Sequence, residues 1–279
     1  MINLVVTSKP VDGLFLYSYE YCSFLNENDI DARVVVICHR DFTPQDYLSV
    51  IQQKYIHCKH VYFDNFVALD SEVAMVLGRS MITLSYKNWR DYTQDQQRAL
   101  TSLFNGKVIS VYSENHPQEY PKALEFFKPI EVIDLCDKEV YPNGIGAHFE
   151  KRINFDIYKP YKDDVQFKHL FFGTTPEYYE AVEKVLPNYP DHGILTYDAE
   201  YVNIKNNNIF VPVENVLGIF DTYVYTKATF DPAPRIVQEC KYFGKSMIYA
   251  RDKDLVDGGS VYWTRDIQQP DIQSIVGAL

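Results

Sequence analysis

The sequence predicts an α/β protein made of two doubly wound parallel sheets, and three observations lead to that prediction. Short apolar runs of strand length alternate with helical periodicity through the first half of the chain, a pattern typical of repeated strand–helix–strand units. The run at residues 33–38 is almost continuously apolar, as strands covered on both faces are. A second alternating series begins near Lys168, after a turn-rich connection over residues 134–164.

The expected elements of the first half follow one another at short intervals. Strands are expected over residues 3–7, 33–38, 60–63, 80–84 and 107–112, and helices over residues 14–26, 43–55, 71–77 and 93–104. Turn residues separate these segments, as at Asn105 and Gly106, which end the last of the helices. The repeated alternation of strand and helix predicts a parallel sheet in this half of the chain.

The second half repeats this alternation. We expect strands at residues 168–172, within 188–195, at 216–220, 221–225 and 246–250, and helices at residues 177–185, just after Pro234, and at 271–279. These limits predict two Rossmann-like domains, residues 1–160 and 161–265. A last helix within residues 266–279 is expected to cross back to the first domain.

Composition narrows the classes of function. The chain has 279 residues and is 46% hydrophobic, which indicates a globular protein. Its net charge of −11 argues against a large surface that binds nucleic acid. Its five cysteines are scattered without a CxxC pair, which predicts reduced thiols and argues against structural zinc. The sequence shows no signal peptide and no membrane-spanning apolar run. Together these features predict a cytoplasmic protein.

One stretch in the second half reads as a loop, a short helix, a glycine stop and a buried strand. Asp231 is expected to cap the helix, Pro234 fits its first turn, and Gly244 fits the left-handed position after it. An apolar face at helical spacing is formed by Ile236, Val237, Cys240 and Phe243. This face is expected to dock the helix on a core.

The two charges on that helix stand in an unfavourable order for stability. Arg235 lies in the first turn, where it opposes the helix dipole, and it precedes Glu239 by four residues, the weaker orientation for an ion pair. An anion held jointly by Arg235 and the helix N-terminus would explain this order. Glu239 could then accept hydrogen bonds from hydroxyls such as those of a ribose. The alternative is an ordinary amphipathic helix with a surface ion pair.

Loops after the expected strands supply further candidates, because doubly wound sheets bind ligands beyond the carboxyl ends of their strands. Asp12 lies in the loop after the first strand, and Glu114 and His116 follow the strand at 107–112. Either of the latter could act as a general base, and the alternative is a solvated loop. Gly173 and Thr174 lie between a strand and a helix, where amides can face a phosphate.

The stretch from Phe230 to Lys245 resembles a segment of phage and viral sugar transferases of the GT-B class, which use nucleotide sugars. In that family the arginine holds the diphosphate and the glutamate holds the ribose. Gly173 and Thr174 stand where the family has a small-residue phosphate loop. Residues 108–117 resemble a segment of phage DNA glucosyltransferases, with Glu114 at an acidic position. The basic residue expected beside the phosphate loop is missing, and Lys227 or Arg251 is the candidate replacement.

The resemblance implies two domains that face each other across a cleft, and a glycosyltransferase that uses a nucleotide-diphosphate sugar, UDP-sugar above all. The implied residues for binding the nucleotide sugar are Gly173, Thr174, Lys227, Asp231, Arg235, Glu239, Gly258 and Gly259. The candidate catalytic bases are Glu114, His116 and Asp12, which an inverting mechanism requires and a retaining one does not. No tightly bound cofactor is implied, and a divalent metal is compatible with the site without being required.

The implied acceptor is a hydroxylated or hydroxymethylated pyrimidine in double-stranded phage DNA. Two alternatives stay open. The acceptor could be a glycan, a lipid-linked sugar or a protein. The chain could also be a nucleotide-sugar-binding protein without catalysis. The sequence leaves the oligomeric state, the sugar and the stereochemistry undetermined.

Overall fold

The structure is a computed structural model of the whole chain. It describes residues 1–6, 13–36, 43–51, 55, 58–62, 73–77, 108–111, 131–134, 139, 142, 147–148, 150, 152–158, 164–173, 176–196, 208–209, 216–227, 231, 234–250, 258–268, 271–273 and 277. The chain divides into two compact units. Unit 1 comprises Met1–Ile153 with Gln268–Leu279, and unit 2 comprises Asn154–Ile267.

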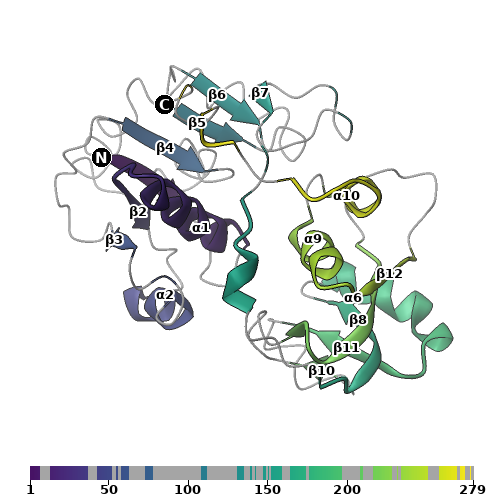
Figure 1. Ribbon diagram of the computed structural model, residues 1–279. Coiled ribbons are helices and arrows are strands. Elements are labelled where there is room, and N and C mark those ends of the chain that lie inside the picture. The colour runs from purple at the N-terminus through teal and green to yellow at the C-terminus, as the bar shows by residue number, and fades with distance from the viewer. Residues whose placement is uncertain are drawn as a thin grey trace. The chain divides into compact units, whose positions relative to one another are not determined.

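Unit 1 is built on a parallel sheet (Figure 1). Its described elements are β1 (Ile2–Val6), α1 (Gly13–Glu27), β2 (Ala32–Val36), α2 (Pro44–Ile51), β3 (Lys59–Tyr62), β4 (Val73–Leu77), β5 (Val108–Val111), β6 (Glu131–Asp134) and β7 (Ala147–His148). The strand order is β3-β2-β1-β4-β5-β6-β7, and each neighbouring pair is parallel. The order reverses between β1 and β4, which is the switch point of a doubly wound sheet.

Helix α1 forms much of the core of unit 1. It lies against β1 and β2, and its side chains Phe15, Tyr19 and Cys22 are fully buried. The rings of Phe15 and Tyr19 pack edge to face, with their centroids 5.1 Å apart. All five residues of β1 are buried, as expected for a central strand covered on both faces. The described cysteines are free thiols and are buried.

Unit 2 has a second parallel sheet. Its described elements are η3 (Phe155–Tyr158), β8 (Phe167–Phe172), α6 (Pro176–Val185), η4 (Leu186–Asn188), β9 (His192–Leu195), β10 (Asn208–Ile209), β11 (Phe220–Tyr225), α9 (Arg235–Tyr242), β12 (Ser246–Tyr249) and α10 (Gly258–Thr264). The strand order is β10-β9-β8-β11-β12, and each neighbouring pair is parallel. The predicted fold class, α/β with two doubly wound parallel sheets, is confirmed.

The switch point of unit 2 lies between β8 and β11. From β8 the chain moves through α6 to β9 on one side, and from β11 it moves through α9 to β12 on the other. Because such crossovers are right-handed, α6 and α9 cover opposite faces of the sheet. On the α6 face, Tyr179 and Val182 pack against Phe171, Ile194 and Val224. In sheets of this kind, ligands bind at the carboxyl side of the switch point.

Two predictions of secondary structure in the described residues are wrong. The expected helix at 71–77 is strand β4 instead, paired in parallel with β1 and β5. Its sequence, VAMVL, is short and apolar, and a run of that length suits a buried strand as well as a helix. The expected strand at 216–220 is a turn, in which the amide of Ile219 donates to the carbonyl of Val216 (3.1 Å). The strand starts only at Phe220.

Other differences concern the limits of elements. The predicted connection at 134–164 contains the end of β6 and the two-residue strand β7, which sequence reasoning did not identify. The helix expected at 43–55 ends at Ile51. The strand expected at 80–84 and the helix expected at 93–104 lie outside the described residues.

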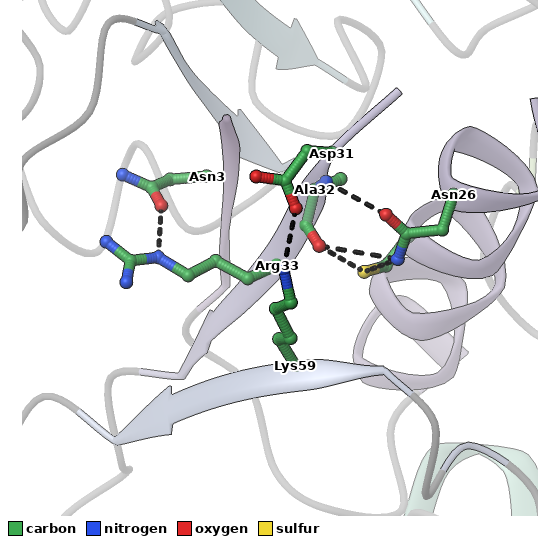
Figure 2. A network of polar contacts seen from close by, with 7 residues as sticks. Asn3, Asn26, Asp31, Ala32, Arg33 and Lys59 are labelled. Carbon is green, nitrogen blue, oxygen red and sulfur yellow. Dashed lines mark hydrogen bonds and ion pairs between the residues drawn. The ribbon is translucent and has the colours of Figure 1, made fainter. Parts of the chain in front are cut away.

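A network of polar contacts joins α1 and the first three strands of unit 1 near the start of those strands (Figure 2). The amide group of Asn26, near the end of α1, donates to the carbonyl of Ala32 (3.3 Å) and accepts from its N–H (2.9 Å). Arg33 Nε donates to Asn3 Oδ1 (2.7 Å), and this contact joins β2 to β1. Lys59 Nζ donates to Asp31 Oδ1 (2.8 Å). These contacts fix α1, β1, β2 and β3 to one another.

Candidate functional site

The carboxyl edge of the sheet in unit 2 brings together several predicted site residues. Gly173 follows β8, and Thr226 and Lys227 follow β11. Helix α9 begins at Arg235, shortly after β11. In a parallel sheet all strands end at the same edge, so these residues belong to one edge of the unit and flank its switch point.

Helix α9 starts later than its capping signal predicts. Pro234 is the N-cap residue, with an extended backbone and no side-chain hydrogen bond to the helix. The prediction that Asp231 caps the helix is therefore wrong, because its carboxylate pairs with Lys227 instead. The helix ends as predicted, with Gly244 at a left-handed φ of +68°. Val237 and Cys240 are fully buried on the expected apolar face.

Arg235 and Glu239 form a buried ion pair. Arg235 Nε donates to Glu239 Oε1 (2.5 Å), and the two side chains are only 10% and 2% exposed. This excludes the alternative of an ordinary surface pair. Removing two charges from water is costly, and their mutual attraction repays that cost only when the geometry is very good. A buried pair whose arginine also opposes the helix dipole is weakly explained by stability.

The buried carboxylate affects its neighbour on α9. Burial raises the pKa of the Cys240 thiol well above its ordinary value, the Glu239 charge raises it further, and Lys245 partly offsets both.

Gln238 is also buried, and within the described part of the chain its Nε2 has no hydrogen-bond partner. A buried amide without a partner is uncommon in folded proteins.

Lys227 and Asp231 form a second ion pair on the same edge, with side chains 27% and 18% exposed. The Lys227 Nζ lies 5.7 Å from the centroid of the Tyr178 ring, which belongs to the first turns of α6. Burial has the largest effect on the pKa of Lys227 and lowers it, but the Asp231 carboxylate and the Tyr178 phenol together outweigh burial. The pKa therefore lies above its ordinary value, and the side chain is a cation at neutral pH.

Gly173 has a packing role that the sequence did not reveal. A Cβ atom there would lie 3.1 Å from both Ile194 Cγ2 and Tyr179 Cε2. Its amide donates to the carbonyl of Leu195 (2.9 Å) and so continues the β8–β9 ladder. That N–H is not available to a phosphate, so any amide that this loop offers to a ligand must come after Gly173.

Gly258 and Gly259, which the resemblance implies as residues that bind the nucleotide sugar, lie in a helix. They begin helix α10, which packs against α9. The aromatic side chain of Tyr262, on the same helix, is buried. This explains why two glycines are tolerated here, because packing of the helix outweighs their weak helix propensity.

The remaining predicted residues, Asp12, Glu114, His116 and Thr174, lie outside the described residues. Within the described ranges, no group of three histidine, cysteine or acidic side chains could hold a metal ion. None of the helices in these ranges is long and apolar enough to cross a membrane.

Sequence reasoning missed three polar residues at the same edge. Thr196 follows β9 and Thr226 follows β11, and both are buried. Tyr178 approaches Lys227 from α6. The two threonines could have been found from the rule that ligands bind where parallel strands end. Tyr178 could not, because only the fold brings α6 beside the end of β11.

The two parallel sheets, each with a reversal of strand order, match the fold of solved glycosyltransferases of the GT-B class. No protein-family model and no curated protein matches the sequence. Solved structures do match the fold. Anabaena Alr3699/HepE, in a crystal structure with UDP-glucose, is 12% identical, with 99% of this chain and 87% of that chain covered and a TM-score of 0.62.

Two further structures are similar at lower scores. A glycosyltransferase from Rickettsia africae is 10% identical, with 88% of this chain and 78% of that chain covered and a TM-score of 0.52. An alpha-glucosyltransferase in complex with UDP and a 13-mer DNA containing an A:G mismatch is 9% identical, with 93% of this chain and 84% of that chain covered and a TM-score of 0.52. At such identities the likeness establishes the fold alone.

Proposed function

We propose that this protein is a glycosyltransferase that takes its sugar from a nucleotide-diphosphate donor, UDP-sugar above all. The observation that carries the proposal is the buried pair of Arg235 and Glu239 at the ligand-binding edge of unit 2. Stability gives little reason to bury this pair, whereas donor binding does. The GT-B fold supports the same conclusion, since HepE and the alpha-glucosyltransferase were solved with UDP-glucose and with UDP.

In this proposal Arg235 and Lys227 hold the diphosphate, and Glu239 accepts hydrogen bonds from the ribose. Negative charge grows on the diphosphate as the sugar bond breaks. Fixed cations at that position therefore stabilise the transition state more than the ground state. The proposed donor domain is residues 161–265, and the proposed acceptor domain is residues 1–160. An inverting reaction would take its base from Glu114, with His116 and Asp12 as alternatives.

The proposed acceptor is a hydroxylated or hydroxymethylated pyrimidine in DNA. The resemblance of residues 108–117 to phage DNA glucosyltransferases supports it, as does the likeness of the fold to an alpha-glucosyltransferase solved with DNA. A second candidate acceptor is a glycan, a lipid-linked sugar or a protein. The net charge of −11 favours this second candidate, because an acidic protein gains little from a phosphate backbone.

The decisive experiment is a hydrolysis and transfer screen over nucleotide sugars, with and without hydroxymethylated duplex DNA. The wild-type chain is expected to consume one donor, and the acceptor that accelerates this reaction identifies the acceptor class. Arg235→Lys keeps the charge and loses the planar fork, so it should lower turnover about tenfold or more. The double variant Arg235→Met with Glu239→Met should abolish turnover while retaining the fold.

A matched control uses the exposed pair of Glu180 and Lys184 on α6, which has the same four-residue spacing. Glu180→Gln with Lys184→Met should leave turnover at the wild-type level. Unchanged turnover in the Arg235 and Glu239 variants would refute the assigned site. Binding of the donor without any turnover, under all acceptors, would identify a nucleotide-sugar-binding protein instead.

A further inference from the structure

The acidic partner of Lys227 is unexpected in a site for an anionic ligand. Asp231 pairs with Lys227 beside the switch point, where the proposed diphosphate would also need that cation. A carboxylate and a diphosphate compete for the same ammonium group. The role of Asp231 in this site therefore needs an explanation of its own.

Lys227 follows one of the two strands that flank the switch point and lies near the helix that follows the other strand. It follows β11 directly, and its ammonium group lies near Tyr178 on α6, the helix that follows β8. Asp231 holds the same ammonium from the loop that leads to α9. Because β8 and β11 are neighbouring strands, this three-residue arrangement spans the position where their carboxyl ends meet.

The chain spaces its charges regularly at this edge. Lys227, Asp231, Arg235 and Glu239 follow at four-residue intervals, and each cation pairs with the carboxylate that follows it. The charges of the two pairs therefore cancel when the site holds no ligand. Glu239 is almost fully buried on α9, whereas Asp231 is more exposed and precedes the helix. Asp231 is thus the carboxylate that can move at lower cost.

A counter-ion for Lys227 has a clear physical use. An ammonium group that is withdrawn from water without an anion tends to lose its proton. Asp231 and Tyr178 oppose this effect in the unliganded protein. The cation is therefore kept charged and in place before any ligand arrives.

We propose that Asp231 is an internal counter-ion, which occupies Lys227 in the unliganded site and releases it to the donor diphosphate. The inference rests on the proposed function and concerns how that same site is regulated. Asp231 acts through Lys227 and is a positioning residue. Asp231 keeps the Lys227 ammonium group charged, but it lowers the affinity for the donor because it competes with the diphosphate for that group. Removing its charge while keeping its shape should therefore tighten donor binding.

The test is calorimetric titration of the full chain with UDP at fixed pH and salt. Asp231→Asn removes the charge and keeps an oxygen that can accept from Lys227, so it should bind UDP about fivefold more tightly than the wild type. Lys227→Met should bind UDP about tenfold more weakly. In the Lys227→Met background, Asp231→Asn should change the affinity little, because the cation it neutralises is gone.

Controls separate this competition from a general change in charge. Glu180→Gln removes a carboxylate from the exposed pair on α6 and should leave the UDP affinity unchanged. Asp231→Glu keeps the charge and should not bind more tightly than the wild type. Circular dichroism confirms the fold of each variant, and Asp231→Ser is the second variant if the asparagine variant does not fold.

The outcomes distinguish the inference from the proposed function. If Asp231→Asn and Asp231→Ser bind UDP equally or more weakly than the wild type, or if their effect is the same with and without Lys227, the inference is overturned. If the wild type binds neither UDP nor any other nucleoside diphosphate, the proposed function itself fails. Tighter binding by Asp231→Asn that depends on Lys227 supports both.

Discussion

The ion pairs of the two units use similar residues but differ in position and exposure. Asp31 and Lys59 pair where β2 and β3 begin, with side chains 53% and 67% exposed. Arg235 and Glu239 pair beyond the end of β11 and are almost fully buried. The first pair joins two neighbouring strands and keeps most of its hydration. The second is largely withdrawn from water and lies at the edge where such sheets bind ligands. For this reason the proposed site is assigned to the second pair and not to the first.

The largest expected effect is on stability when the buried pair is broken. Glu239→Ala leaves the Arg235 charge buried without its carboxylate, and we expect the free energy of unfolding of unit 2 to fall by about 3–5 kcal/mol. Urea denaturation followed by circular dichroism measures this loss. Lys59→Ala, which breaks the exposed pair with Asp31, should shift the unfolding midpoint far less.

Replacing both members of the buried pair sharpens the comparison. Arg235→Met with Glu239→Met removes both charges and should recover most of the stability that Glu239→Ala loses, because a well-packed apolar pair can replace a buried ion pair. A loss from Glu239→Ala no larger than that from Lys59→Ala would mean that the two pairs are energetically alike.

The next effect concerns Gly173, which the sequence presented as a possible phosphate loop. Gly173→Ala would press a methyl group against Ile194 and Tyr179, and we expect a loss of about 1–3 kcal/mol in the free energy of unfolding. Thermal or urea unfolding measures it. A neutral result would show that Tyr179 can move aside, and the glycine would then need a role in ligand binding.

A smaller effect on the free energy of unfolding is expected at the ends of two helices, one from each unit. Gly244 follows α9 with φ of +68°, and Asp29 follows α1 with φ of +62°. Gly244→Ala should cost about 1 kcal/mol, since an L-residue is strained in the left-handed region. Asp29→Gly should relieve such strain and stabilise unit 1 by a few tenths of a kcal/mol, about 0.5 at most. Equal effects of one sign would contradict this view.

The smallest effect is that of Asp31 and depends on pH. The hydrogen bond from Lys59 is the main cause that lowers the pKa of Asp31 in the folded protein. Its contribution to stability is therefore present above the unfolded pKa, about 3.9, and is lost as pH falls through the lower folded value. The Asp31→Asn variant should unfold at a slightly lower urea concentration than the wild type at pH 7, and this difference should vanish at acid pH. A difference that grows on acidification would contradict the assignment.

The sequence predicted those parts of the fold that depend on short-range pattern. Strands such as β1 and β2, and helices such as α1, follow from apolar runs and periodicity. The pattern did not identify β4, because a five-residue apolar run has no distinguishing period. It also did not show β7, a strand of two residues that is defined by its pairing with β6.

The same limit applies to the candidate site. The order of Arg235 and Glu239 was informative because helix dipoles and pair orientation act locally. Their burial was not predictable, since it depends on elements that pack around α9 in three dimensions. The capping prediction for Asp231 failed for a similar reason, because Lys227 competes for the carboxylate. The approach of Tyr178 to Lys227 depends wholly on the order of the strands.

The pairing of β8 with β11 has a consequence for folding. Phe167 pairs with Phe220, although β9 and β10 lie between these strands in the chain. Closing so long a loop loses chain entropy before the contacts between the strands stabilise the pairing, and such non-local pairings therefore form slowly. A chain that emerges from the ribosome only as far as β10 contains β8 but lacks the strand that completes the candidate site. Binding of the proposed donor would then report that unit 2 has finished folding.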